Sequence, residues 1–419
     1  MSKARRPGAL LIALALASCT RSETAAPGFS PPEPGIVKPC DPCTDAKDKD
    51  KEQWDVMHPP GEAGDLGVDV TIDTIEGTWM SVDVSPDGRD VVFDLLGDLY
   101  VIPISGGQAK AITSGMAWDM QPRFSPDGQW IAFTSDRGGG DNVWVVRRDG
   151  SDARAVTEED FRLVNSPVWS PDGRFLAVRK HFTKHRSLGA GEIWLYHASG
   201  GKGVPLTEKE NDQKDVGEPA FSPDGRYLAF TSMARDGYES DQNRLMVLDR
   251  ESGAVRRVDD WDESVGGFAW LPDGSGFLLS CDWRGAHHLF RLPLAGGAPV
   301  PITKGRMHVD GVAPAAGGEH AFALRMTTER PNELVRVTLG DGKVEALTDV
   351  NGAVFADLAL PTVEERWFEA TDGERIHAWI VKPPGFDPSK RYPMLTYCQG
   401  GPQSQVGQWF SFRWNFHLM

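Results

Sequence analysis

A four-residue motif, Ser-Pro-Asp-Gly, recurs through the middle of the 419-residue chain and limits the folds that the chain can adopt. Proline presets φ at the second position of a turn, aspartate caps the turn, and glycine accepts backbone angles that other residues avoid. Successive copies are separated by 40, 45, 52 and 49 residues. A turn that returns at this period predicts an array of similar structural units. The copies begin at Ser85, Ser125, Ser170, Ser222 and, with leucine in the first position, Leu271.

Each unit has the pattern of about four short β-strands. An aromatic residue precedes the turn, and an apolar run such as WIAFTS or YLAFTS follows it. A second run such as NVWVV comes next, and a glycine-containing hairpin leads to a last strand. Repeats of this length built from strands predict a β-propeller with one blade per unit, and a β-sandwich is the alternative. We expect an all-β propeller over residues 66–360, with six to seven blades and eight as the upper limit. A degenerate sixth copy lies near Ala313, and a weaker seventh lies around 351–363.

The N-terminus has the pattern of an export signal. Basic residues precede a short apolar run, Ala9–Ala17, which is too short for a permanent membrane span. The run ends in Leu-Ala-Ser-Cys, which resembles a bacterial lipoprotein box with Cys19 as the lipidated residue. We therefore expect a lipoprotein signal peptide over residues 1–18 and a periplasmic, membrane-anchored protein. An ordinary signal peptide is the alternative, and it also predicts export.

Residues 19–65 have the composition of a disordered linker, because proline, glycine and charged residues dominate. Cys40 and Cys43 form a C-x-x-C motif. Neither a βαβ pattern nor a second cysteine pair accompanies it, so a local disulfide is favoured over redox or zinc chemistry. The net charge of −16 argues against nucleic-acid binding.

The sequence changes character over residues 361–419. Two alternating runs flank a Thr-Asp-Gly turn and predict a β-hairpin. Met394–Cys398 is a continuously apolar run, as expected of a strand buried on both faces, and the final RWNFHLM is a candidate helix start. This order of elements predicts the incomplete N-terminal part of an α/β-hydrolase domain. In that fold the loop after the third strand supplies backbone N–H groups to an oxyanion hole, and glycine permits the close approach.

The segment TDGERIHAWIVKPPGFDPSKRYPMLTYCQGGPQSQ resembles the entry into the catalytic domain of the prolyl oligopeptidase family of serine peptidases. The resemblance covers residues 217–419 and is strongest to the dipeptidyl-peptidase and acylaminoacyl-peptidase branches. It implies that Gln399, Gly400 and Gly401 serve the oxyanion and substrate. Gln399 stands where many members carry histidine. The N-terminal half resembles TolB-like propellers and those that precede metal-dependent amidohydrolases.

The resemblance implies a serine exopeptidase acting on short peptides, with the propeller as a substrate gate. The sequence contains no G-x-S-x-G motif, and the family's Ser, Asp and His follow the glycine loop. We therefore expect no catalytic residue in this chain, which would be inactive alone. Glu239, in the acidic segment RDGYESD, is a candidate ligand for a substrate's free amino group, and a solvated loop is the alternative. A non-catalytic TolB-like binding module and an amidohydrolase propeller are alternative functions.

Histidine pairs do not predict a metal site. His181 and His185 are four residues apart but fall in an expected propeller loop, where we expect exposure. His287 and His288 are adjacent in a strand-like run and point to opposite faces, so they cannot chelate together. The sequence thus indicates no metal and no cofactor.

Overall fold

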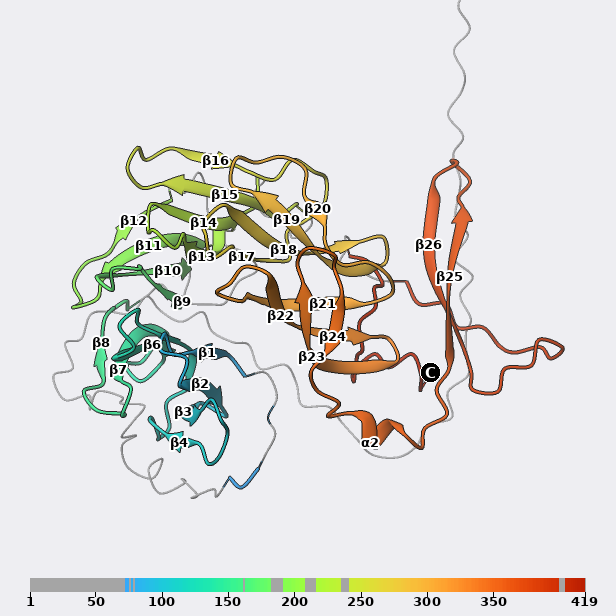
Figure 1. Cartoon of the computed structure of the whole chain (residues 1–419), viewed down its shortest axis with the longest axis horizontal. Coiled ribbons are helices and arrows are strands. Elements are labelled where there is room, and N and C mark those ends of the chain that lie inside the picture. Colours follow the sequence, from blue (N-terminus) through green and yellow to red (C-terminus); the bar gives the residue numbers. More distant parts are fainter. Residues whose placement is uncertain are drawn as a thin grey trace, which may run out of the picture. The chain divides into compact units, whose positions relative to one another are not determined.

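The protein is described from a computed structural model, drawn in Figure 1. The described residues are 72–74, 77, 80–160, 163–181, 191–207, 216–234, 241–398 and 404–418. Several residues named above lie outside them: Cys19, Cys40, Cys43, His185, Glu239, Gln399, Gly400 and Gly401. Within the described residues, no helix has the length and hydrophobicity that a membrane crossing needs.

The first part of the chain forms four separate four-stranded antiparallel sheets, each from consecutive strands. Blade 1 contains β1 (Val82–Val84), β2 (Asp90–Leu95), β3 (Asp98–Pro103) and β4 (Lys110–Ala111). Blade 2 contains β5 (Asp119–Phe124), β6 (Trp130–Ser135), β7 (Asn142–Arg147) and β8 (Arg154–Ala155). Blade 3 contains β9 (Val164–Trp169), β10 (Phe175–His181), β11 (Gly191–His197) and β12 (Val204–Pro205). Blade 4 contains β13 (Val216–Phe221), β14 (Tyr227–Ser232), β15 (Arg244–Asp249) and β16 (Val255–Arg257).

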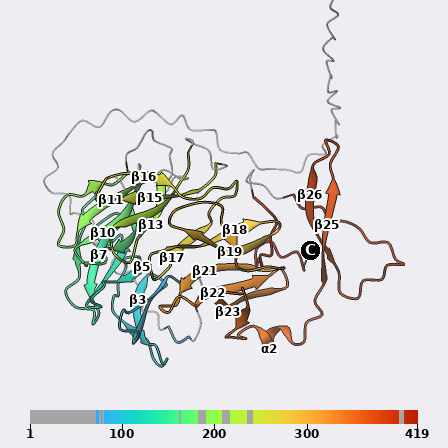
Figure 2. The same ribbon diagram turned by 45° about the horizontal axis from the view of Figure 1, so that its top comes forward.

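Two further units share one sheet. Blade 5 contains β17 (Gly267–Trp270), β18 (Gly276–Trp283), β19 (Ala286–Pro293) and β20 (Val300–Pro301). Blade 6 contains β21 (His308–Pro314), β22 (His320–Thr327), β23 (Arg330–Thr338) and β24 (Val344–Ala346). The two are joined by a parallel contact between His287 of β19 and His308 of β21. Figures 1 and 2 show the sheets following one another in chain order. The predicted β-propeller is confirmed, with six four-stranded units in the described part of the chain.

The hydrophobic core is divided among the contacts between successive blades. Phe133 of β6 packs toward blade 1, whereas Ala132, its neighbour in the same strand, packs toward blade 3. Five such clusters join blades 1–2, 2–3, 3–4, 4–5 and 5–6. Since alternate residues of a strand point to opposite faces, a strand between two blades must be apolar on both. This explains runs such as WIAFTS, and it excludes a sandwich, in which two sheets enclose one core.

The repeated turn is held by the same hydrogen bonds in the first four copies. In blade 2, Ser125 Oγ donates to Asp127 Oδ1 at 2.6 Å and accepts from the Trp130 backbone N–H at 2.9 Å. The Gly128 N–H donates to the Ser125 carbonyl at 2.8 Å. Equivalent Ser–Asp bonds of 2.6 Å occur at Ser85, Ser170 and Ser222. The repeated turns of neighbouring blades also lie close together. A Cβ built at Gly128, in the turn of blade 2, would lie 3.5 Å from Pro86 in the turn of blade 1.

A second recurring bond links the residue two positions after the last strand of a blade to the third strand. In blade 2, Thr157 Oγ1 accepts from the Val143 backbone N–H at 2.9 Å, and both residues are buried. The same bond, over the same separation of 14 residues, involves Thr113, Thr207, Thr303 and Thr348. In blade 4, Asp259 takes the place of threonine. The bond satisfies a buried N–H that the short fourth strand leaves without a partner.

The tail begins as predicted and then departs from the prediction. β25 (Thr362–Glu369) and β26 (Arg375–Lys382) form the expected antiparallel hairpin. Residues 394–398 form no strand, and Met394 is 88% exposed, which corrects the expected buried strand. No helix occurs in residues 413–418, which form bends and a turn. The suggested seventh blade is also wrong, because α2 (Gly352–Phe355) and the start of β25 occupy those residues.

Candidate functional site

The segment after the glycine loop docks on the turn between β18 and β19 of blade 5. Gln405 makes two hydrogen bonds there: its Oε1 accepts from the Gly285 N–H at 2.8 Å, and its Nε2 donates to the Ala286 carbonyl at 2.7 Å. The side chain thus pairs with the turn backbone through both ends of its amide. Gln405 lies two residues after residues 399–403, which are outside the described residues, so this contact attaches the segment that follows them in the sequence to the propeller.

The hairpin β25–β26 reinforces this junction. A Cβ at Gly285, whose φ is +78°, would lie 2.1 Å from the His377 ring, so only glycine fits between turn and hairpin. Trp379 Nε1 donates to the Val406 carbonyl at 2.9 Å, which ties β26 to the docked segment. On the propeller side, Arg306 Nη1 donates to the Val363 carbonyl at 2.9 Å and its guanidinium lies 5.5 Å from the Trp379 ring centroid.

Beside this turn lies a cluster of two histidines and two aspartates. Nδ1 of His287 lies 2.7 Å from Oδ1 of Asp282 across the β18–β19 pair. The rings of His287 and His308 stack with centroids 4.3 Å apart and planes at 20°. Oδ1 of Asp310 accepts from Ser280 Oγ at 3.0 Å. Four polar side chains from three strands therefore converge where the tail meets the propeller.

Burial and mutual charge set the protonation of this cluster. Burial, with the His287 charge as a second cause, lowers the pKa of His308 to about 4. The same two causes lower the pKa of His288 to about 4. For Asp282, burial acts to raise the pKa, but the hydrogen bond and charge of His287 outweigh it and the pKa is lowered. Near neutral pH the cluster therefore offers neutral imidazole from His308 and an ionised carboxylate from Asp282.

Blades 1 and 2 hold a second group of carboxylates. Asp119 is buried and paired with Arg137, which also lies 5.3 Å from the Phe133 ring centroid. Burial and the nearby Asp119 charge raise the pKa of Asp98 to about 6, and Asp98 Oδ1 is buried without a hydrogen-bond partner among the described residues. The pair is far in sequence from the docked tail, and its arginine partner is typical of an ion pair that stabilises a blade contact.

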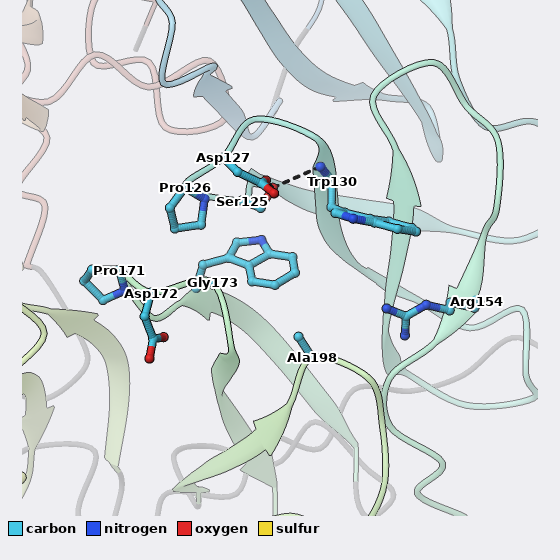
Figure 3. A pocket seen from close by; sticks show the side chains of 10 residues that line it. Ser125, Pro126, Asp127, Trp130, Arg154, Pro171, Asp172, Gly173 and Ala198 are labelled. Carbon is cyan, nitrogen blue, oxygen red and sulfur yellow. Dashed lines mark hydrogen bonds between the residues drawn. The ribbon is translucent and has the colours of Figure 1, made fainter.

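A cavity of about 430 Å³ lies between the repeated turns of blades 2 and 3. Figure 3 shows Asp127 and Asp172 from the two turns on one side and Trp130 with Arg154 on another. The adjacent Trp169 Nε1 donates to the Arg123 carbonyl at 3.1 Å. The same tryptophan bond recurs between blades 4 and 5, from Trp270 to Ala220. The cavity is thus the space that the repeated packing of two neighbouring blades leaves between their turns, and we do not assign it a catalytic role.

One prediction about a single residue, His181, is corrected. His181 is not an exposed loop histidine, because it ends β10, is 4% exposed, and its Nε2 lies 3.0 Å from Asn165 Nδ2. Asp241, from the same acidic segment as Glu239, is buried, and its Oδ2 accepts from the Ala234 N–H at 2.8 Å. His287 and His288 do contact different neighbours, Asp282 and Thr303 respectively.

Sequence reasoning missed the cluster partners of His287. His308 and Asp310 lie about 20 residues further along the chain, and no motif links them to it. Gln405 belongs to the glycine-rich stretch, but no sequence pattern predicts its hydrogen bonds to Gly285 and Ala286. Each depends on which strands the fold brings together.

These features define a class of fold, a β-propeller of four-stranded blades followed by a β-hairpin that packs against its fifth blade. Residues 67–215 match the family model described as the TolB beta propeller domain. A crystal structure of puromycin hydrolase shares this fold, with a TM-score of 0.60, 19% identity, and coverage of 80% of this chain and 56% of that one.

Among curated proteins, the chain is related to peptidases. It is 37% identical to dipeptidyl-peptidase 5 of Porphyromonas gingivalis over 256 residues, which cover 60% of this chain. It is 22% identical to the uncharacterized peptidase YuxL of Bacillus subtilis over 74% of this chain and 61% of that protein. The matched region spans 37% of the length of the dipeptidyl-peptidase.

Proposed function

We propose that the chain is the propeller-containing part of an exported serine exopeptidase that acts on short peptides. The observation that carries the proposal is the 37% identity to a dipeptidyl-peptidase. The geometry of the tail supports it, because Gln405, which follows the predicted oxyanion loop in the sequence, is hydrogen-bonded to the β18–β19 turn, and Val406 is hydrogen-bonded to Trp379 of β26. The reaction would be nucleophilic acyl transfer, with Gly400 and Gly401 leaving room for the developing oxyanion.

The exposed apolar surface of the tail supports a hydrolase domain larger than the one described. Leu395 is 72% exposed and Met394 88% exposed, although their run is as apolar as a buried parallel strand. Phe412 and Leu418 are 84% and 86% exposed. Apolar surface gathered in one segment is typical of a face that another element covers. In the proposed protein, the strands and helices that carry the nucleophile, the acid and the base cover it.

The propeller would restrict the substrates by controlling access. Its blades are joined by closely packed apolar clusters, so it forms a rigid wall rather than a flexible lid. Since the tail docks on blade 5, a peptide would react at the face of the propeller next to the β18–β19 turn. In this proposal Glu239 binds the free amino group of the substrate, and Glu239→Gln raises KM for free dipeptidyl substrates while leaving N-acylated substrates unaffected.

The test uses the longer protein that contains this chain and the remaining hydrolase residues. It is assayed with dipeptidyl-p-nitroanilides and with matching substrates whose amino group is acetylated. Hydrolysis of the free dipeptidyl substrates indicates a dipeptidyl-peptidase, and preference for the acetylated ones indicates an acylaminoacyl-peptidase. Hydrolysis of neither, or hydrolysis abolished by a metal chelator but not by a serine-directed inhibitor, contradicts the proposal and favours a binding module or an amidohydrolase.

We further propose that the protein is exported and anchored to a membrane through Cys19. The support is the order of basic residues, apolar run and Leu-Ala-Ser-Cys in the sequence. Metabolic labelling with a palmitate analogue in a bacterial host tests this. We expect label on the unaltered chain and none on Cys19→Ala. Equal labelling of both proteins contradicts the anchor.

A further inference from the structure

We propose that His287, His308 and Asp310 bind a zinc ion that joins blade 5 to blade 6. One potential ligand atom from each of the three lies within 4.8 Å of the others. Two imidazole nitrogens and one carboxylate oxygen are a ligand set that zinc commonly takes, with a fourth position left for water or another ligand. The inference does not depend on the peptidase function, because no proposed catalytic group takes part.

The strongest evidence is the arrangement of His287. Its Nδ1 lies 2.7 Å from the Asp282 carboxylate, which accepts the ring N–H and so fixes the tautomer. In the neutral ring the other nitrogen, Nε2, is then a lone-pair acceptor. His287 is 8% exposed, and no hydrogen-bond partner for Nε2 exists among the described residues. A buried acceptor without a partner costs free energy, and a metal ion would remove that cost.

The backbone holds the other two ligands in register with His287. His308 is its parallel strand partner, which explains why the two rings stack at 4.3 Å. Asp310 follows two residues later in β21 and therefore projects from the same face. Its Oδ1 accepts from Ser280 Oγ at 3.0 Å, so the carboxylate already points toward blade 5.

Two glycines without side chains lie beside the cluster. Gly266 and Gly267 line the same side: a Cβ at Gly266 would lie 3.1 Å from the His287 Cε1, and one at Gly267 would lie 3.9 Å from the Asp310 Oδ1. Tetrahedral zinc with bonds of about 2.1 Å separates its ligand atoms by about 3.4 Å. The Asp310 side chain is exposed, so a change of its rotamer is the adjustment toward the two histidines that the proposal requires.

The experiment measures zinc binding to the full chain by competition with a chromophoric chelator. All proteins carry Cys40→Ser and Cys43→Ser, so that these thiols cannot supply a site. We expect one zinc per chain. We expect His308→Ala and Asp310→Asn each to weaken binding by about tenfold or more. The matched control is His197→Ala, which removes an exposed histidine of blade 3 and should leave the affinity unchanged.

A second readout separates a lost ligand from a misfolded protein. Zinc should raise the melting temperature of the parent chain and of His197→Ala, and should raise it less in Asp310→Asn, whose amide keeps an acceptor for Ser280. The absence of zinc binding by the folded parent chain overturns the proposal. So does binding that persists at full affinity in both His308→Ala and Asp310→Asn.

Discussion

Replacing Gln405 with alanine should release the tail from the propeller without unfolding either. The substitution removes two hydrogen bonds, of 2.8 Å to Gly285 and 2.7 Å to Ala286. Each such bond contributes about 0.5–1.5 kcal/mol net, so docking should weaken by about 1–3 kcal/mol. Because 1.4 kcal/mol corresponds to about tenfold, the undocked population should rise by about 5- to 150-fold.

Native-state hydrogen exchange measures this population directly, because the Gly285 amide donates to Gln405 and exchanges when the tail undocks. We expect faster exchange at Gly285 and in residues 404–418, with unchanged exchange in blades 1–4. The matched control is Gln242→Ala, which also removes two amide hydrogen bonds, to the Trp261 and Glu263 carbonyls within the propeller. If Gly285 exchanges at the same rate in Gln405→Ala as in the parent chain, the docking contact is refuted.

Two further predictions concern the propeller. Thr157→Val should lower the free energy of unfolding by about 1–3 kcal/mol, because the buried Val143 N–H loses its acceptor. Thr157→Ser keeps the hydroxyl and should lose less stability. Denaturant titration compares the two variants, and an equal loss of stability in both would contradict the role of the hydroxyl. Asp98→Asn should stabilise the protein at pH 7. The folded pKa of Asp98, about 6, exceeds the ordinary 3.8, so the parent chain gains stability as pH falls from 7 to 4, and the variant's advantage should fade over that range. If the stability of Asp98→Asn relative to the parent chain instead increases as pH falls to 4, burial does not raise the pKa of Asp98.

The blades could be predicted because their signals are local. A Ser-Pro-Asp-Gly turn is closed by bonds within six residues, such as those of Ser125 with Asp127 and Trp130, so four letters suffice to specify it. The strands that flank it are apolar at consecutive positions because both faces are buried. The hydrogen bonds from a backbone N–H to a threonine hydroxyl recur as regularly, but donor and acceptor are 14 residues apart. A single threonine at that distance does not predict the bond from the sequence.

The tail and the histidine cluster could not be predicted in the same way. Met394–Cys398 has the composition of a buried strand, but a strand forms only where neighbours accept its hydrogen bonds, and none lies beside it in the described residues. The approach of His308 to His287 depends on a single parallel contact between two blades. His181 is the last residue of β10 rather than a loop residue, because the strand extends one residue beyond the run FLAVRK that marks it in the sequence.

The central claim is the proposed function, a serine peptidase in which the loop that contains Gln399, Gly400 and Gly401 serves the oxyanion. The most direct measurement is labelling with a serine-directed fluorophosphonate, applied to this chain and to the longer protein with its hydrolase residues, each against a heat-denatured control. We expect specific labelling of the longer protein, its loss when the serine of a G-x-S-x-G motif is replaced by alanine, and none of the 419-residue chain. Specific labelling of the 419-residue chain, or none of the folded longer protein, would contradict the account.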